Sequence, residues 1–111
     1  MADQHVVEFD GVRLTRLPVG RAEGLVRVSF VGKGEALKYG GRHPIDWLLG
    51  QHVTITWPDQ ARAEIVSSGS GGGDGISFFD VAIRDRGGSS LVLDYAEGPN
   101  DLGGESVLIP D

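Results

Sequence analysis

The chain has 111 residues, of which 40% are hydrophobic and 23% charged, and it contains no cysteine. This length and composition fit one globular domain over residues 1–111 and exclude a disulfide framework, a thiolate metal site and a cysteine nucleophile. Sixteen acidic against ten basic side chains give a net charge of −6, which argues against nucleic-acid or anionic-membrane binding.

The N-terminal residues lack the basic and apolar segments of a signal peptide. No apolar stretch approaches the roughly 20 residues that a membrane-spanning helix needs. We therefore expect a cytoplasmic protein without a membrane partner.

The first part of the chain alternates apolar and polar residues, which is typical of strands. Two strands are predicted at His5–Phe9 and Val12–Leu17, because Asp10-Gly11 between them is the signature of a two-residue type I′ hairpin. A third strand is predicted at Leu25–Val31.

One short helix is predicted at Pro44–Leu49, with proline in its first turn and Gly50 just past its end. The strand expected next, Gln51–Trp57, places Val53, Ile55 and Trp57 on one face. Its other face carries His52, Thr54 and Thr56, so we expect His52 to be solvated.

In the second part we expect strands at Ala61–Val66, Ile76–Arg84, Ser90–Tyr95 and Ser106–Ile109. The low-complexity segment Ser67–Gly75 is predicted as a flexible loop. Residues Arg86–Ser89 are predicted as a hairpin loop.

Seven to eight short strands and one short helix predict an all-β domain, either an antiparallel sandwich or a small barrel. The segments Phe30–Leu37 and Leu48–Ile55 resemble the opening β-domain of contractile-tail spike and hub proteins. This resemblance implies a β-barrel, and no functional residue is carried over from it.

Gly32–His43 is the segment richest in functional side chains. Its candidate ligand-binding residues, suited to a small anion, are Lys33, Lys38, Tyr39, Arg42 and His43. Gly32-Lys33-Gly34 does not match a Walker phosphate loop, so a polar connection without a ligand is the alternative.

The negative charge is concentrated in the second half of the chain. Residues 1–56 carry seven basic and six acidic groups, and residues 57–111 carry three and ten. Opposed charges steer protein encounters, so the candidate partner-binding acids are Asp94, Glu97, Asp101 and Glu105. The alternative is that these acids serve solubility.

Phe78 and Phe79 are adjacent, so in a regular strand they point to opposite faces. One of them must then leave the main core, which makes this pair a candidate interface.

We assign no catalytic residue, metal or cofactor. His5, His43 and His52 lack zinc-site spacing, Gly69–Ser77 is a single imperfect copy of a stacked calcium repeat, and no Gly-x-Ser-x-Gly motif occurs.

The leading hypothesis is a non-enzymatic, bacterial-type protein-interaction module, such as an inhibitor or immunity-type protein whose acidic face meets a cationic partner. One alternative is a small-molecule-binding barrel, or an enzyme built on one, with its site at residues 32–43 and 69–75. Another is a structural subunit of a phage-tail-like or other assembly.

Overall fold

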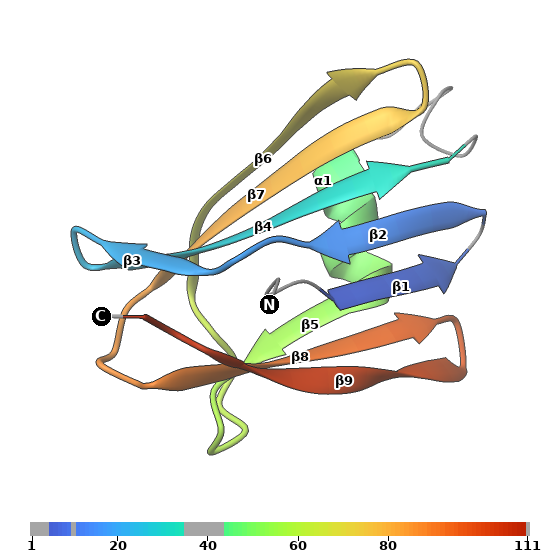
Figure 1. The fold of residues 1–111 in the computed structure, drawn as a ribbon. Coiled ribbons are helices and arrows are strands. Elements are labelled where there is room, and N and C mark those ends of the chain that lie inside the picture. Colours follow the sequence, from blue (N-terminus) through green and yellow to red (C-terminus); the bar gives the residue numbers. More distant parts are fainter. Residues whose placement is uncertain (1–4, 10, 35–43, 111) are drawn as a thin grey trace.

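The computed structural model of the chain describes residues 5–9, 11–34 and 44–110, and these form two antiparallel sheets with nine strands (Figure 1). The all-β prediction is confirmed. Of the two predicted architectures the sandwich is correct and the closed barrel is wrong, because the two sheets share no strand pairing. The Cα radius of gyration is 13.5 Å, close to the roughly 13 Å of a compact domain of 100 residues.

The larger sheet, called sheet A, has the order β1-β2-β4-β7-β6, and β3 pairs with the start of β4. Its strands are β1 (His5–Phe9), β2 (Val12–Arg16), β3 (Gly20–Ala22), β4 (Leu25–Lys33), β6 (Ile65–Gly73) and β7 (Ile76–Arg84). The predicted bounds of β1 and β7 are confirmed, whereas β3 was not predicted.

The smaller sheet, called sheet B, has the order β5-β8-β9. It contains β5 (Val53–Thr56), β8 (Ser90–Glu97) and β9 (Asn100–Leu108). The chain changes sheets after β4, after β5 and after β7. The prediction of a hairpin at Arg86–Ser89 is therefore wrong, because this segment joins a strand of sheet A to a strand of sheet B.

The predicted helix lies where expected but is longer and changes type. It begins as α1 (Pro44–Trp47) and continues as a π-helical turn, η2 (Leu48–His52), so Gly50 lies inside the helical segment. Contacts of α1 with β6 and β7, and of η2 with β5 and β8, place the helical segment across both sheets.

The prediction of a flexible loop at Ser67–Gly75 is wrong. Most of this segment belongs to β6, which pairs with β7 from Ser67 opposite Ala82 to Gly73 opposite Ile76. The turn is made by Asp74 and Gly75, with φ of 55° and 83°, the positive values that a type I′ hairpin needs at both central positions.

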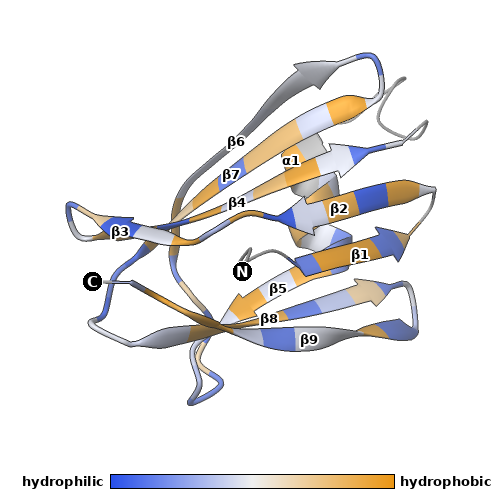
Figure 2. Ribbon diagram, viewed as in Figure 1, coloured by the Kyte–Doolittle hydropathy of each residue, from blue (hydrophilic) through white to orange (hydrophobic). Residues whose placement is uncertain are grey.

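The space between the sheets is filled by apolar side chains. Phe30, Phe79, Leu91, Leu93 and Ile83 are each at most 1% exposed. Figure 2 shows hydrophobic and hydrophilic residues alternating along β2 and β8, the pattern of strands with one face turned to the core. None of the helical segments within the described ranges is long and apolar enough to cross a membrane.

Candidate functional site

The two sheets carry opposite charge. The strands of sheet A hold six basic side chains and two carboxylates. The strands of sheet B hold four carboxylates and no lysine or arginine. Four of the ten carboxylates of residues 57–111 thus lie on the strands of sheet B, although β6 and β7 of the same half belong to sheet A.

The acidic hairpin, formed by β8 and β9, carries the exposed Asp94 and Asp101 and the half-buried Glu97 near its two-residue loop. Asp94 and Asp101 line one shallow hollow of about 280 Å³ beside Thr54 of β5. One carboxylate oxygen of Asp101 accepts the Gly103 N–H at 2.8 Å. Within the described residues, no salt bridge joins Asp94 or Asp101 to a basic group. Asp94 and Asp101 therefore present negative charge that no described basic side chain neutralises.

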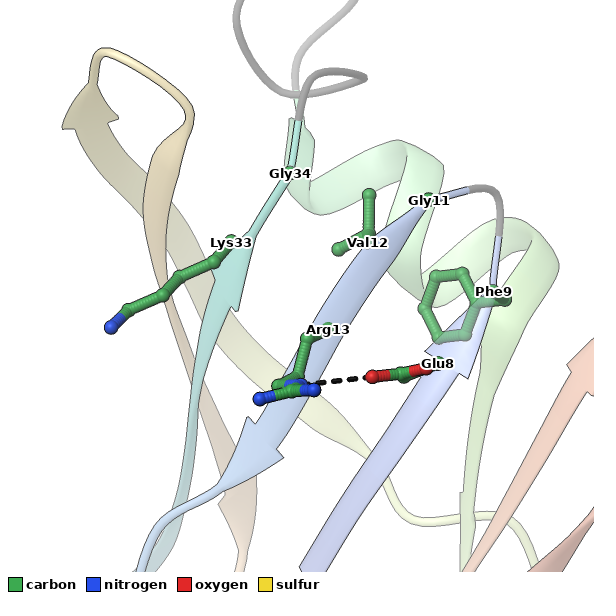
Figure 3. A pocket seen from close by; sticks show the side chains of 7 residues that line it. All are labelled: Glu8, Phe9, Gly11, Val12, Arg13, Lys33 and Gly34. Atoms are coloured by element: carbon green, nitrogen blue, oxygen red, sulfur yellow. Dashed lines mark hydrogen bonds and ion pairs between the residues drawn. The ribbon is translucent and has the colours of Figure 1, made fainter.

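A second hollow lies beside Lys33, the candidate ligand-binding residue at the end of β4. It measures about 570 Å³, is open to solvent, and is lined in part by Phe9, Val12 and Arg13. Figure 3 shows that Lys33 extends away from Phe9 and Val12, while Arg13 is held by Glu8 at 2.9 Å. The Gly34 N–H also donates to Gly75 O at 2.8 Å. This hydrogen bond joins the two segments in which a small-molecule site was expected, residues 32–43 and 69–75.

The other four candidate ligand-binding residues, Lys38, Tyr39, Arg42 and His43, lie outside the described residues. The small-molecule site therefore stays a prediction. Its barrel is replaced by a sandwich, and residues 69–73, expected as a loop, belong to β6.

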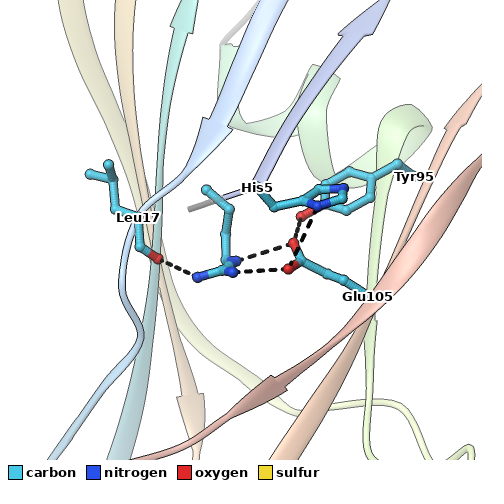
Figure 4. Close-up of polar contacts among 5 residues, drawn as sticks. His5, Leu17, Tyr95 and Glu105 are labelled. Carbon is cyan, nitrogen blue, oxygen red and sulfur yellow. Dashed lines mark hydrogen bonds and ion pairs between the residues drawn. The ribbon is translucent and has the colours of Figure 1, made fainter. Parts of the chain in front are cut away.

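Glu105 lies farther along β9 than Asp101, opposite the buried Leu93. Its side chain is 12% exposed and faces Arg16 of β2, which is 4% exposed. The guanidinium donates from Nε and Nη2 to the two carboxylate oxygens at 3.1 and 2.9 Å, and from Nη1 to Leu17 O at 3.1 Å. Glu105 is thus engaged inside the domain and adds nothing to an exposed acidic surface (Figure 4).

Two further residues complete this contact between the sheets, which we call the inter-sheet clamp: Arg16, Glu105, Tyr95 and His5. The Tyr95 hydroxyl donates to Glu105 at 2.6 Å, and the His5 ring stacks on Tyr95 with 5.3 Å between ring centroids. Burial, followed by the hydrogen bond and the charge of Glu105, raises the pKa of Tyr95 far above its ordinary value of 10.0. Tyr95 is therefore held as a neutral donor, and the clamp is a structural tie, because its acid, base and phenol groups satisfy one another.

The prediction that Phe78 and Phe79 face opposite sides of their strand is confirmed. Phe79 is fully buried between the sheets, and Phe78 is 52% exposed on the outer face of sheet A. Its neighbours in that row are Val31 of β4 and Gly71 of β6.

The expectation of a solvated His52 is wrong. Its side chain is 3% exposed, stacks on Phe9 with 4.1 Å between centroids, and donates from Nδ1 to Ala96 O at 2.8 Å. The reason is that His52 ends η2 instead of lying in a strand, so the period-two rule does not apply to it. The inter-sheet clamp and this packed histidine were both missed, since each depends on contacts between elements far apart in the sequence.

No three His, Asp or Glu side chains of the described ranges come together in a group able to hold a metal ion. What the arrangement provides chemically is an acidic hairpin with the exposed carboxylates Asp94 and Asp101, and a sheet face with the exposed Phe78. No protein-family model, no curated protein and no solved structure matches the chain.

Proposed function

We propose that this domain is a non-enzymatic protein-interaction module, of the inhibitor or immunity type, that binds a partner with a cationic surface through the acidic hairpin. The observation that carries the proposal is the separation of charge between the sheets. The exposed carboxylates Asp94 and Asp101 have no basic residue on the strands of their own sheet, and no described salt bridge neutralises them.

The rigidity of the hairpin supports the same function. Asp94 and Asp101 project from paired strands that are fixed to the core through Leu93 and Tyr95, both at most 1% exposed. Charges held in place by such a scaffold lose little conformational freedom on binding, which favours affinity and register.

The proposal is tested by capture from a lysate of the source organism on three immobilised proteins. These are the wild type, the variant Asp94→Lys/Asp101→Lys, and the control Glu8→Lys/Glu64→Lys. The control makes the same change in net charge at exposed acids beside sheet A, whose surface ion pairs contribute little to stability.

We expect a basic protein that the wild type and the control retain and the hairpin variant loses. Retention of the same proteins by all three would contradict the proposed site. If only acidic or neutral proteins showed the selective pattern, the expected chemistry of the partner would be wrong.

A further inference from the structure

The β6 edge of sheet A differs from the edges formed by β1, β5 and β9. Strand β6 is nine residues long and carries no charged residue and no proline. Of the remaining edge strands, β1 has five residues and Glu8, β5 has four residues, and β9 contains Asp101 and Glu105. Proteins usually protect long edges with charge, proline or a covering segment, because unpaired N–H and C=O groups template a further strand.

The β6 backbone is exposed and regular over most of its length. Its residues are exposed or half-buried throughout, and its one register irregularity lies between Ile65 and Ser67. From Ser67 to Gly73 the side chains are only serine and glycine, so the strand's own side chains do not screen its outward-pointing backbone groups.

Exposed apolar surface gathers at the same edge. Of the six large exposed hydrophobic residues in the described ranges, four lie on β6 and β7: Ile65, Val66, Ile76 and Phe78. A bare strand edge and apolar side chains beside it are the two components of a strand-addition interface.

The geometry points to a second copy of this chain as the strand that occupies this edge, paired antiparallel with β6 across a two-fold axis. Such an isologous contact places the bulky start of one β6, Ile65–Val66, against the glycine end of the other, Gly71–Gly73, where there is room for it. A parallel, in-register pairing of two β6 strands would instead set the bulky residues of the two copies together.

Charge is compatible with the same occupant at this edge because β6 itself is uncharged. Two copies with a net charge of −6 repel one another, and β6 is the long edge at which they meet without bringing strand charges together. Two acids flank β6: Glu64 just before it, which Arg84 neutralises at 2.8 Å, and Asp74 in the turn just after it. The acidic hairpin lies on the other sheet and stays free for its own partner.

The test is sedimentation velocity over a wide concentration range with paired charge variants of β6. An added Cβ at Gly69 or Gly71 meets nothing within 4 Å, so both positions accept longer side chains without disturbing the fold. The variants are Gly69→Lys/Gly71→Lys and Gly69→Glu/Gly71→Glu, with Ser106→Lys/Leu108→Lys on the exposed side of β9 as the matched control.

We expect a reversible wild-type dimer, a dissociation constant raised about tenfold or more by either β6 variant alone, and recovery of the dimer when the two β6 variants are mixed. The β9 control and Asp94→Lys/Asp101→Lys should dimerise as the wild type does, which separates this inference from the proposed function.

A wild type that stays monomeric at the highest concentration would overturn the inference. So would a dimer that only the β9 variant disrupts, or β6 variants that fail to recover on mixing while circular dichroism shows them folded. Capture of another protein's extended segment at β6 by a monomeric wild type would assign the edge to a different occupant and would also overturn it.

Discussion

Asp94 and Glu105 are carboxylates on neighbouring strands, and their environments differ because of register. Asp94 pairs with Gly104, and Glu105 pairs with the buried Leu93, so the two acids point to opposite faces of sheet B. One remains exposed, and the other enters the space between the sheets, where Arg16 neutralises it. The composition of the chain does not distinguish these two acids, and their different environments follow only from the pairing of β8 with β9.

Replacing Glu105 by glutamine should destabilise the domain by about 3 kcal/mol, because it leaves the buried Arg16 charge uncompensated. The matched change Asp94→Asn should stay within about 0.5 kcal/mol of the wild type, since that side chain is exposed. Urea unfolding of both variants measures the difference. Equal effects would show that the inter-sheet clamp is not formed.

Tyr95 predicts a pH dependence of stability. Its folded-state pKa is raised above the unfolded value of about 10, so the unfolded chain loses the phenol proton first as the pH rises. The stabilisation is therefore complete below pH 10 and is lost above it, at up to about 1.4 kcal/mol per pH unit. Urea unfolding between about pH 9 and 11 should show a steeper loss for the wild type than for Tyr95→Phe. Parallel curves would contradict this origin of the slope.

Among the elements, the strands predicted best are those whose sequence alternates clearly. The bounds of β1 and β7 follow from alternation next to an Asp-Gly turn or a buried apolar run. Strand β6 has no such signal, because serine and glycine have low strand propensity. It is a strand because β7 offers a pairing edge and Asp74-Gly75 makes the turn. That dipeptide was the available signal, and it is the same one that correctly predicted the turn after β1.

The same limit applies to β9 and to the crossing between sheets. The first half of β9 was not predicted as a strand because it contains glycines, and there Gly103 and Gly104 pair with Tyr95 and Asp94. The crossing after β7 is set by packing, since Gly88 lies against the Trp57 ring. Contacts of this kind join elements about 30 residues apart and leave no local pattern.

Strand β7 offers an internal comparison between its two faces. Phe79→Ala should cost about 3–5 kcal/mol, because it empties a fully buried position. The half-exposed Phe78→Ala should cost far less, about 1 kcal/mol or below. Thermal unfolding of both variants tests this directly. A larger loss of stability for Phe78→Ala than for Phe79→Ala would contradict the assignment of the Phe79 face of sheet A to the core.

For the whole molecule, the sequence shows an acidic second half, and the fold places four of its ten carboxylates on sheet B, whose strands carry no lysine or arginine. Of the four candidate partner-binding acids, Asp94, Glu97 and Asp101 lie on one hairpin, whereas Glu105 is part of the inter-sheet clamp. The candidate partner-binding residue on sheet A, Phe78, lies on the other sheet and beside the free β6 edge. The two proposed contact surfaces are thus separate, one charged and one formed by backbone and apolar groups.

The most direct test of the proposed function is the affinity of the captured basic partner, measured by calorimetry at about 0.1 M and about 1 M ionic strength. Between these conditions the Debye length falls from about 10 Å to about 3 Å. The account predicts that wild-type binding weakens strongly with salt, and that Asp94→Lys/Asp101→Lys binds weakly at both concentrations. A wild-type affinity that is insensitive to salt, or a hairpin variant that binds as tightly as the wild type, would contradict the proposal that the acidic hairpin is the binding site.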